Sequence, residues 1–266
     1  RDLLVHLECD YLVIGSGNAG LRATIELAEH GRVVILSKEN PNEGSTLYAQ
    51  GGIAVVMNPD DKVEFHVQDT LHAGAGLCHP AVVEAMVGEG ILRVQELLDW
   101  GADFDRDGDD LKFGMEGAHR VRRVVHRGDA TGAETQNVLV SRALEHGNVE
   151  VMEHTIAVDI LTVDGVCRGA LATDSDGELV AIIAKATIVA AGGHGQVYGY
   201  TSNPSVATGD GIAMCFRAGA EVADMEFVQF HPTTLHLHGA PRFLISEAVR
   251  GEGAQLLNSR GERFML

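Results

Sequence analysis

This sequence of 266 residues lacks closely spaced cysteines and long apolar runs. Its four cysteines, Cys9, Cys78, Cys167 and Cys215, form no Cys-x-x-Cys pair, so we interpret them as reduced, mostly buried thiols of a cytosolic protein. No apolar run approaches the roughly 18 residues that a membrane-spanning helix requires. The pattern of a secretory signal is missing as well, and we expect a cytoplasmic location.

Positive charge and aromatic residues are also scarce. Lys and Arg number 20 against 38 Asp and Glu, which gives a net charge of −18. A field of this sign argues against nucleic acids and acidic membranes as partners. Aromatic residues make up only 5% of the chain whereas glycine occurs 32 times, a composition that suits an α/β protein with many tight strand-to-helix turns.

A glycine motif stands near the N-terminus. Residues 10–14 are apolar and β-branched, as in a buried strand, and residues 18–30 have the apolar spacing of a helix. Between them lies Gly15-x-Gly17-x-x-Gly20, whose glycines permit a tight turn and close approach of a pyrophosphate to the helix N-terminus. The motif predicts a nucleotide site, and a glycine-rich turn without a ligand is the alternative.

The next strand, residues 32–37, ends without the acidic residue that usually binds a ribose hydroxyl. Ser37 and Lys38 stand there instead. A serine hydroxyl can bond a ribose without charge assistance, while a basic residue can accept a 2′-phosphate, so NADP competes with FAD at this point. The small, hydroxyl and amide residues of the following loop, 43–52, favour FAD because their backbone N–H groups can approach a flat polar ring. A plain surface loop is the alternative.

Farther along, helical patterns cover residues 62–74, 80–100 and 131–146, and another helix begins at Gly209–Asp210. We expect Val83, Met86 and Val87 among the residues on the buried face of the second of these helices. Residues 155–163, 165–174 and 178–193 read as strands joined by "DG" and "DSDG" turns, which predicts a β-meander ending in the small residues "AAGG".

Two polar segments are candidates for substrate binding. Glu116 precedes four arginines, at positions 120, 122, 123 and 127. The arginines suit a dicarboxylate or the FAD pyrophosphate, and Glu116 suits an ammonium group. The alternative is a charged surface hairpin with internal ion pairs.

In the second segment, Gln229 and His231 share a face of an extended stretch and can bond a carboxylate together with the Ser246 hydroxyl, which adjoins Glu247. Three nearby histidines, at 231, 236 and 238, lack the cysteine or carboxylate partners of a metal cluster, so we expect no metal.

The chain resembles the L-aspartate oxidase family of the succinate dehydrogenase and fumarate reductase flavoprotein superfamily. The resemblance covers essentially the whole chain, in family order, and rests on "DYLVIGSGNAGL", "SKENPNEGSTLYAQGGIA", "EGAHRVRRVVHRGDATGAE", "SNPSVATGDGIAM", "EFVQFHPTTL" and "SEAVRGEGAQL". It implies an α/β fold: a Rossmann-like FAD-binding domain with a β-meander insertion, residues 1–229, and the start of an α+β capping domain, residues 230–266. Because family members continue beyond "RFML" and hold an acid–base arginine there, we expect an incomplete chain without full turnover.

For the cofactor, the resemblance implies FAD in place of NADP. Respiratory members bond the flavin through a histidine where this chain has Ser45, so the FAD is expected to be noncovalent. Sequence pattern and resemblance together predict these cofactor residues: Gly15, Ser16, Gly17, Asn18, Ala19, Gly20, Ser37, Lys38, Gly44, Ser45, Thr46, Leu47, Tyr48, Ala49, Gln50, Gly51, Gly52, Ile156, Ala157, Ala191, Gly192 and Asp210.

For the reaction, the resemblance implies oxidation of L-aspartate to iminoaspartate, the first step of quinolinate and NAD biosynthesis, with oxygen or fumarate as acceptor and quinolinate synthase downstream. Glu116 would lie by the substrate amino group, and Gln229, His231, Ser246 and Glu247 by its carboxylates. A soluble fumarate reductase-type flavoprotein, which would interconvert fumarate and succinate, and a noncatalytic flavin-binding module are the alternatives.

Overall fold

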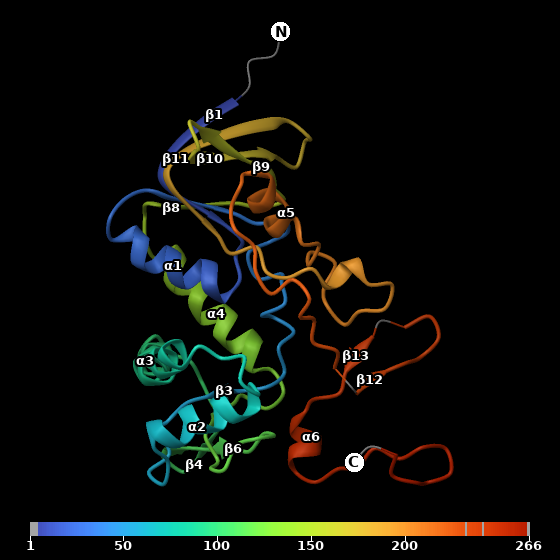
Figure 1. Ribbon diagram of the computed structural model, residues 1–266. Coiled ribbons are helices and arrows are strands. Elements are labelled where there is room, and N and C mark those ends of the chain that lie inside the picture. The colour runs from blue at the N-terminus through green and yellow to red at the C-terminus, as the bar shows by residue number, and fades with distance from the viewer. Residues whose placement is uncertain (1–4, 232, 241, 265–266) are drawn as a thin grey trace. The chain divides into compact units, whose positions relative to one another are not determined.

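A computed structural model describes residues 5–231, 233–240 and 242–264 (Figure 1). The chain forms two compact units. Unit 1 comprises Arg1–Tyr48, Thr135–Pro232 and His236–Phe243, and unit 2 comprises Ala49–Glu134, Thr233–Leu235 and Leu244–Leu266. Both units contain residues from either side of the expected domain boundary at 229/230, and that division stays a prediction. Residues 1–4 and 265–266, at the two ends of the predicted domains, lie outside the described residues.

Unit 1 is built on a six-stranded sheet of order β8-β2-β1-β11-β10-β9. Four strands run parallel, and the last two complete an antiparallel meander with β11. The sheet confirms the predicted α/β class and the meander, whereas β8 was not predicted. The strands are β1 (Val5–Ile14), β2 (Val33–Leu36), β8 (Val149–Met152), β9 (Ile156–Val163), β10 (Val166–Thr173) and β11 (Leu179–Val189).

The parallel strands are apolar because both faces of the sheet are covered. Leu12, Val13 and all four residues of β2 are at most 2% exposed, as expected for strands buried on both sides. Helix α1 (Asn18–Ala28) packs on β1 and β2, and α5 (Asp210–Arg217) packs on β9. The parallel strands β1 and β2 and the helix between them thus form a β1–α1–β2 unit.

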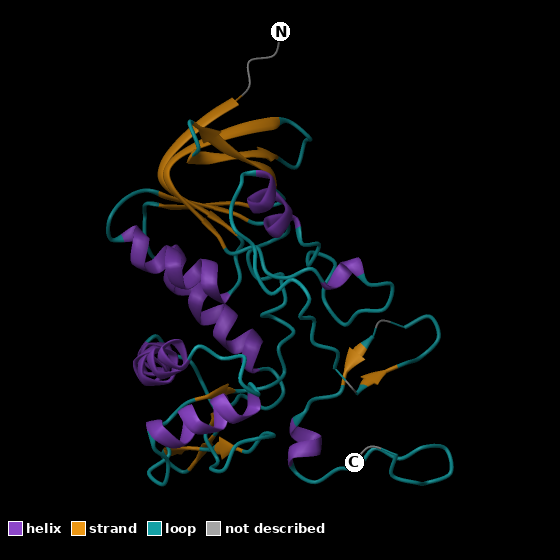
Figure 2. Cartoon of the chain, viewed as in Figure 1, coloured by secondary structure: helices purple, strands orange, loops and turns teal. Residues whose placement is uncertain are grey.

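Unit 2 contains helices and only short strands (Figure 2). Helix α2 (Val63–Ala73) packs against α3 (Pro80–Asp99), in agreement with the predicted ranges. Val83 and Val87 of α3 are buried as expected, but Met86 is 57% exposed, so the expectation for Met86 was wrong. The short strands are β3 (Ile53–Ala54), β4 (Arg106–Asp107), β5 (Asp110–Leu111), β6 (Phe113–Gly114) and β7 (Val124–Val125).

The remaining elements follow the predictions in part. Helix α4 (Thr131–Leu144) begins in unit 2 and continues into unit 1, and a 3-10 turn, η1, spans Gly195–Val197. Near the C-terminus lie β12 (Thr234–Leu235), β13 (Phe243–Leu244) and helix α6 (Ala248–Gly251). The four free cysteines are half-buried rather than mostly buried. Across the described ranges, no helix combines the length and the apolar character that crossing a bilayer requires.

Candidate functional site

A pocket in unit 1 opens where the parallel strands β1 and β2 end. Ligands of such sheets bind outside the carboxyl ends of the strands. The lining residues come from both strands, from the loops that follow them, and from two segments after β8 and β11. They are Ile14–Gly17, Leu36–Glu39, Glu43–Thr46, Thr155, Ala157, Ala190–Gly193, Val206, Ala207 and Asp210.

The glycines of the first turn are required by close backbone contacts. Gly15 has φ +112°, and a Cβ there would stand 2.3 Å from the Ala190 carbonyl oxygen. A Cβ on Gly20 would stand 2.0 Å from the Gly15 oxygen, so only glycine lets α1 approach β1 this closely. A Cβ on Gly17 would meet only the Thr46 hydroxyl, at 3.4 Å, which leaves its pocket side open.

The N-terminus of α1 begins at this turn. Gly17 is the N-cap, and no side chain of the described residues caps the helix there. One N–H of the first turn, that of Asn18, donates to the Thr46 hydroxyl at 3.4 Å. Uncapped N–H groups and the positive end of the helix dipole make such a terminus an anion site. The turn therefore fits the pyrophosphate of a dinucleotide.

At the ribose position, two serine hydroxyls replace the usual acid. Ser16 Oγ and Ser37 Oγ are buried and lie 2.9 Å apart. A carboxylate does line the pocket two residues farther on. Glu39, which was not among the predicted residues, lies 3.3 Å from His154 Nδ1.

Lys38 lines the same pocket, but its ammonium group is used within the protein. It donates to Asp210 Oδ1 at 2.6 Å, to the Thr208 hydroxyl at 2.7 Å and to the Val206 carbonyl at 2.9 Å. Burial raises the pKa of Asp210, but the hydrogen bonds from Lys38 and Thr208 outweigh burial and hold it below its usual value. A 2′-phosphate would have to compete with Asp210 for this lysine, which weakens the case for NADP.

Twelve of the predicted cofactor residues line the pocket: Gly15, Ser16, Gly17, Ser37, Lys38, Gly44, Ser45, Thr46, Ala157, Ala191, Gly192 and Asp210. Others in unit 1, namely Asn18, Ala19, Gly20, Leu47, Tyr48 and Ile156, are not among its lining residues, and Ala49–Gly52 belong to unit 2. Sequence reasoning missed the other nine lining residues: Ile14, Leu36, Glu39, Glu43, Thr155, Ala190, Gly193, Val206 and Ala207. Ala190 and Gly193 flank the predicted residues Ala191 and Gly192, whereas no local sequence pattern marks Val206 and Ala207 as cofactor residues.

In unit 2, the candidate substrate residue Glu116 lies by the glycine loop that ends at Gly52. A Cβ on Gly51 would stand 3.3 Å from Glu116 Oε1. A Cβ on Gly117 would stand 3.5 Å from Glu247 Oε1, and one on Gly251 would stand 2.7 Å from the Met115 oxygen. The loop around Glu116 therefore packs against the glycine loop and against both ends of the short helix α6.

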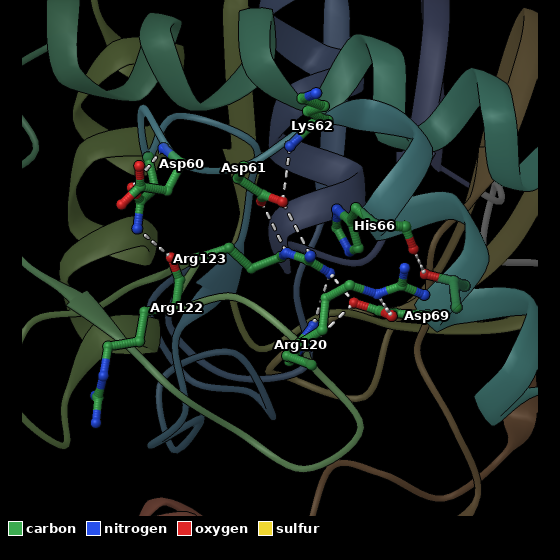
Figure 3. A network of polar contacts seen from close by, with 11 residues as sticks. Asp60, Asp61, Lys62, His66, Asp69, Arg120, Arg122 and Arg123 are labelled. Atoms are coloured by element: carbon green, nitrogen blue, oxygen red, sulfur yellow. Dashed lines mark hydrogen bonds and ion pairs between the residues drawn. The ribbon is translucent and has the colours of Figure 1, made fainter.

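The four arginines that follow Glu116 pair with carboxylates, but these carboxylates lie outside the segment, and Arg123 is fully buried, so the segment is not a surface hairpin with internal ion pairs. Arg120 bonds Asp69 and Arg122 bonds Glu252. The Arg127 guanidinium lies 3.0 Å from Asp103 and 3.6 Å from Asp105. Figure 3 shows Arg123 between Asp61 and Asp69. Each of these guanidinium groups has a carboxylate partner within unit 2, so its charge is already compensated.

The four candidate residues of the second polar segment belong to different units. Gln229 is exposed and His231 half-buried in unit 1, whereas Ser246 and Glu247 belong to unit 2. The Ser246 hydroxyl accepts the Ala248 N–H at 3.3 Å, and Glu247 Oε1 lies 3.5 Å from Arg250 Nη2. Glu247 is therefore paired with an arginine three residues farther along the chain. Within the described part of the chain, no group of His, Cys, Asp and Glu side chains is arranged to hold a metal ion.

Comparison with protein families identifies the family of the chain. The model of the family described as FAD binding domain matches residues 10–266. The chain belongs to this family. Its cofactor is FAD, which agrees with the prediction and with the glycine cradle at Gly15, Gly17 and Gly20.

The FAD-binding domain is similar to named enzymes over nearly its whole length. It is 46% identical to L-aspartate oxidase 2-a, chloroplastic, of Nicotiana tabacum, over 96% of this chain and 42% of that protein. It is also 46% identical to L-aspartate oxidase of Vibrio cholerae, over 97% of this chain and 51% of that protein. The chain thus spans about half the length of the curated relatives it matches.

Among solved structures, the FAD-binding domain is similar to E. coli quinol fumarate reductase FrdA. The two align with a TM-score of 0.93 and 33% identity, over 98% of this chain and 45% of that one. This similarity confirms the predicted α/β fold and the predicted superfamily.

Proposed function

We propose that the protein oxidises L-aspartate to iminoaspartate with noncovalent FAD, using oxygen or fumarate as acceptor. This reaction would begin quinolinate and NAD biosynthesis, in a reducing compartment such as the cytoplasm, with quinolinate synthase acting on the product. The observation that supports it most is the 46% identity with L-aspartate oxidases over nearly the whole chain, against 33% with quinol fumarate reductase.

The proposed substrate contacts follow from the charges around Glu116. Its carboxylate beside Gly51 would hold the α-ammonium of aspartate, a group that succinate and fumarate lack. Gln229, His231 and Ser246 would donate hydrogen bonds to the substrate carboxylates, and Arg250 would neutralise Glu247. Bound FAD would supply the hydride acceptor. Ser45, which lines the pocket, has no imidazole for a bond to the flavin.

Anaerobic reduction tests the proposal. The complete protein, purified with FAD, is titrated with L-aspartate while its visible flavin absorption is recorded, and succinate serves as the matched dicarboxylate without an amine. We expect bleaching by aspartate and little by succinate. Reduction by succinate alone would favour the fumarate reductase-type alternative. The absence of any flavin absorbance would favour a noncatalytic module.

A substitution at Glu116 tests recognition of the amine. We expect Glu116→Gln to lower kcat/KM for aspartate by about 10- to 100-fold, because a charged hydrogen bond is lost, and to change fumarate reduction little. Glu252→Gln is the control, since Glu252 is an exposed glutamate of unit 2 that bonds Arg122. Equal losses for both substrates in Glu116→Gln would contradict a role in binding the ammonium.

A further inference from the structure

Gln136 of α4 joins two backbone segments next to the FAD pocket. Its side chain is 1% exposed. Nε2 donates one hydrogen bond to the Ser16 carbonyl and another to the Pro41 carbonyl, each at 2.7 Å. Gln136 itself does not line the pocket, whereas Ser16 does and Pro41 shortly precedes the lining residues Glu43 and Gly44. The amide therefore links the glycine turn that follows β1 to the loop that follows β2.

The orientation of this amide is determined by chemistry. Both partners are carbonyl oxygens, which only accept, so the NH₂ group must face them. The Gln136 Oε1 atom is buried and accepts no hydrogen bond from any residue that the structure describes. An unpaired acceptor in a dry site is costly. The side chain is held in place by its two donated bonds, and an apolar residue of equal size would lose both.

The bond to Ser16 also orients the next N–H group. In a trans peptide the carbonyl and the following N–H point in opposite directions. Because the Ser16 carbonyl is directed at Gln136, the Gly17 N–H points away from Gln136. The other links between the turn and the loop are longer: 2.9 Å between Ser16 Oγ and Ser37 Oγ, and 3.4 Å from the Asn18 nitrogen to Thr46 Oγ1.

We propose that Gln136 is a positioning residue for FAD. By holding the Ser16 and Pro41 carbonyls together, it sets the spacing between the glycine turn and the 40–46 loop, and it aims the Gly17 N–H at the cofactor pyrophosphate. The inference depends on FAD binding and goes beyond the proposed oxidation of aspartate, since it holds for any substrate.

Two matched substitutions test the proposal in the complete protein. Gln136→Met keeps the volume and removes both donors. Asn148→Leu is the control, because Asn148 Nδ2 also bridges two carbonyls, those of Ala28 and Gly31, at 2.7 Å each, away from the pocket. Binding of FAD and of ADP, which contains the adenosine and pyrophosphate moieties alone, is measured by titration at a temperature where both variants are folded, together with Tm.

We expect a rise in the Kd of FAD and of ADP of at least about tenfold only in Gln136→Met, and wild-type affinity in Asn148→Leu, whatever the change in Tm of each variant. Gln136→Asn, one methylene shorter, keeps a polar group and cannot reach both carbonyls, so its Kd should rise as well even if Gln136→Met fails to fold. Wild-type affinity in Gln136→Asn, or an equal loss of affinity in Asn148→Leu, would overturn the proposal. Neither outcome depends on turnover of aspartate, so the two proposals fail separately.

Discussion

Replacing Arg123 by Met is expected to lower the free energy of unfolding by about 3–5 kcal/mol, because it leaves the buried Asp61 carboxylate without its cation and Asp69 with Arg120 alone. The Arg123 side chain is fully buried. Its guanidinium donates to Asp61 at 2.9 and 3.0 Å and to Asp69 at 2.8 Å, and the Asp61 side chain is itself fully buried. These bonds connect Arg123 to Asp61, which precedes α2, and to Asp69, which lies within α2 (Figure 3).

The neighbouring Arg122 provides the control. It bonds Glu252 at 3.0 Å, but the two side chains are 51% and 59% exposed. An exposed ion pair of this kind contributes roughly 0–1 kcal/mol, so Arg122→Met should change stability little. Urea unfolding of both variants measures the difference. Equal losses would show that burial of the Arg123 cluster does not determine its contribution.

The same cluster predicts how stability depends on pH. The pKa values of His66 and His119 are lowered, first by burial and then by the charge of Arg123. Asp61 and Asp69 oppose this effect at both histidines, and Glu116 opposes it at His119. His119 Nδ1 lies 3.1 Å from Arg123 Nη1 and must accept there, since guanidinium has no acceptor. A histidine pKa lowered by folding gives stability that is present above about pH 6.5 and lost as the pH falls toward the folded value.

Asp69 extends this dependence to lower pH. Burial raises its pKa, but bonds from Arg120 and Arg123 outweigh burial and lower it, so its contribution is present above the unfolded pKa and is lost as the pH falls further. Because of the two histidines, the urea concentration at the unfolding midpoint of the wild type should decrease when the pH is lowered from 7.5 to 5.5. It should fall less in Arg123→Met, because one cause of the lowered histidine pKa values is removed. A steeper fall in the variant would contradict this assignment.

Substituting Gly15 by Ala is the second change for which we expect a large effect: loss of bound FAD together with a loss of stability of about 3 kcal/mol or more. An alanine at φ +112° is strained by about 1–3 kcal/mol. In addition, its Cβ would stand 2.3 Å from the Ala190 oxygen, on backbone that cannot move aside without breaking the 2.8 Å bond from the Ala190 nitrogen to the Ile14 oxygen.

Gly17→Ala is the matched comparison at the same turn. Its new Cβ would meet only the Thr46 hydroxyl, at 3.4 Å, so the protein should fold with near wild-type stability. FAD should still bind more weakly, because the methyl group stands where the pyrophosphate approaches. Thermal unfolding and the flavin absorbance of the purified variants distinguish the two. A Gly15→Ala protein of wild-type stability would contradict the role of the Ala190 contact.

The elements that the sequence predicts well are those with a strong local pattern. The strand–turn–helix of residues 10–30 and the helices α2 and α3 were found because apolar spacing and glycine positions lie within a few residues. The short strand β8 was not found, since its four residues, Val149–Met152, are too few for a clear period and follow α4 closely. Met86 was predicted on the buried face of α3 because its spacing fits the apolar periodicity. Periodicity does not determine how much of the helix surface neighbouring elements cover.

The sequence by itself determined the glycine turn and the preference for FAD. Whether a residue can adopt the conformation of Gly15, or allow a phosphate to approach Gly17, depends on that residue alone. Only the tertiary structure decided which charges and amides meet. Lys38 is 172 residues from Asp210, Arg123 is 62 residues from Asp61, and Gln136 is 120 residues from Ser16. The partner of a buried polar group depends on packing between distant segments, and no local pattern records it.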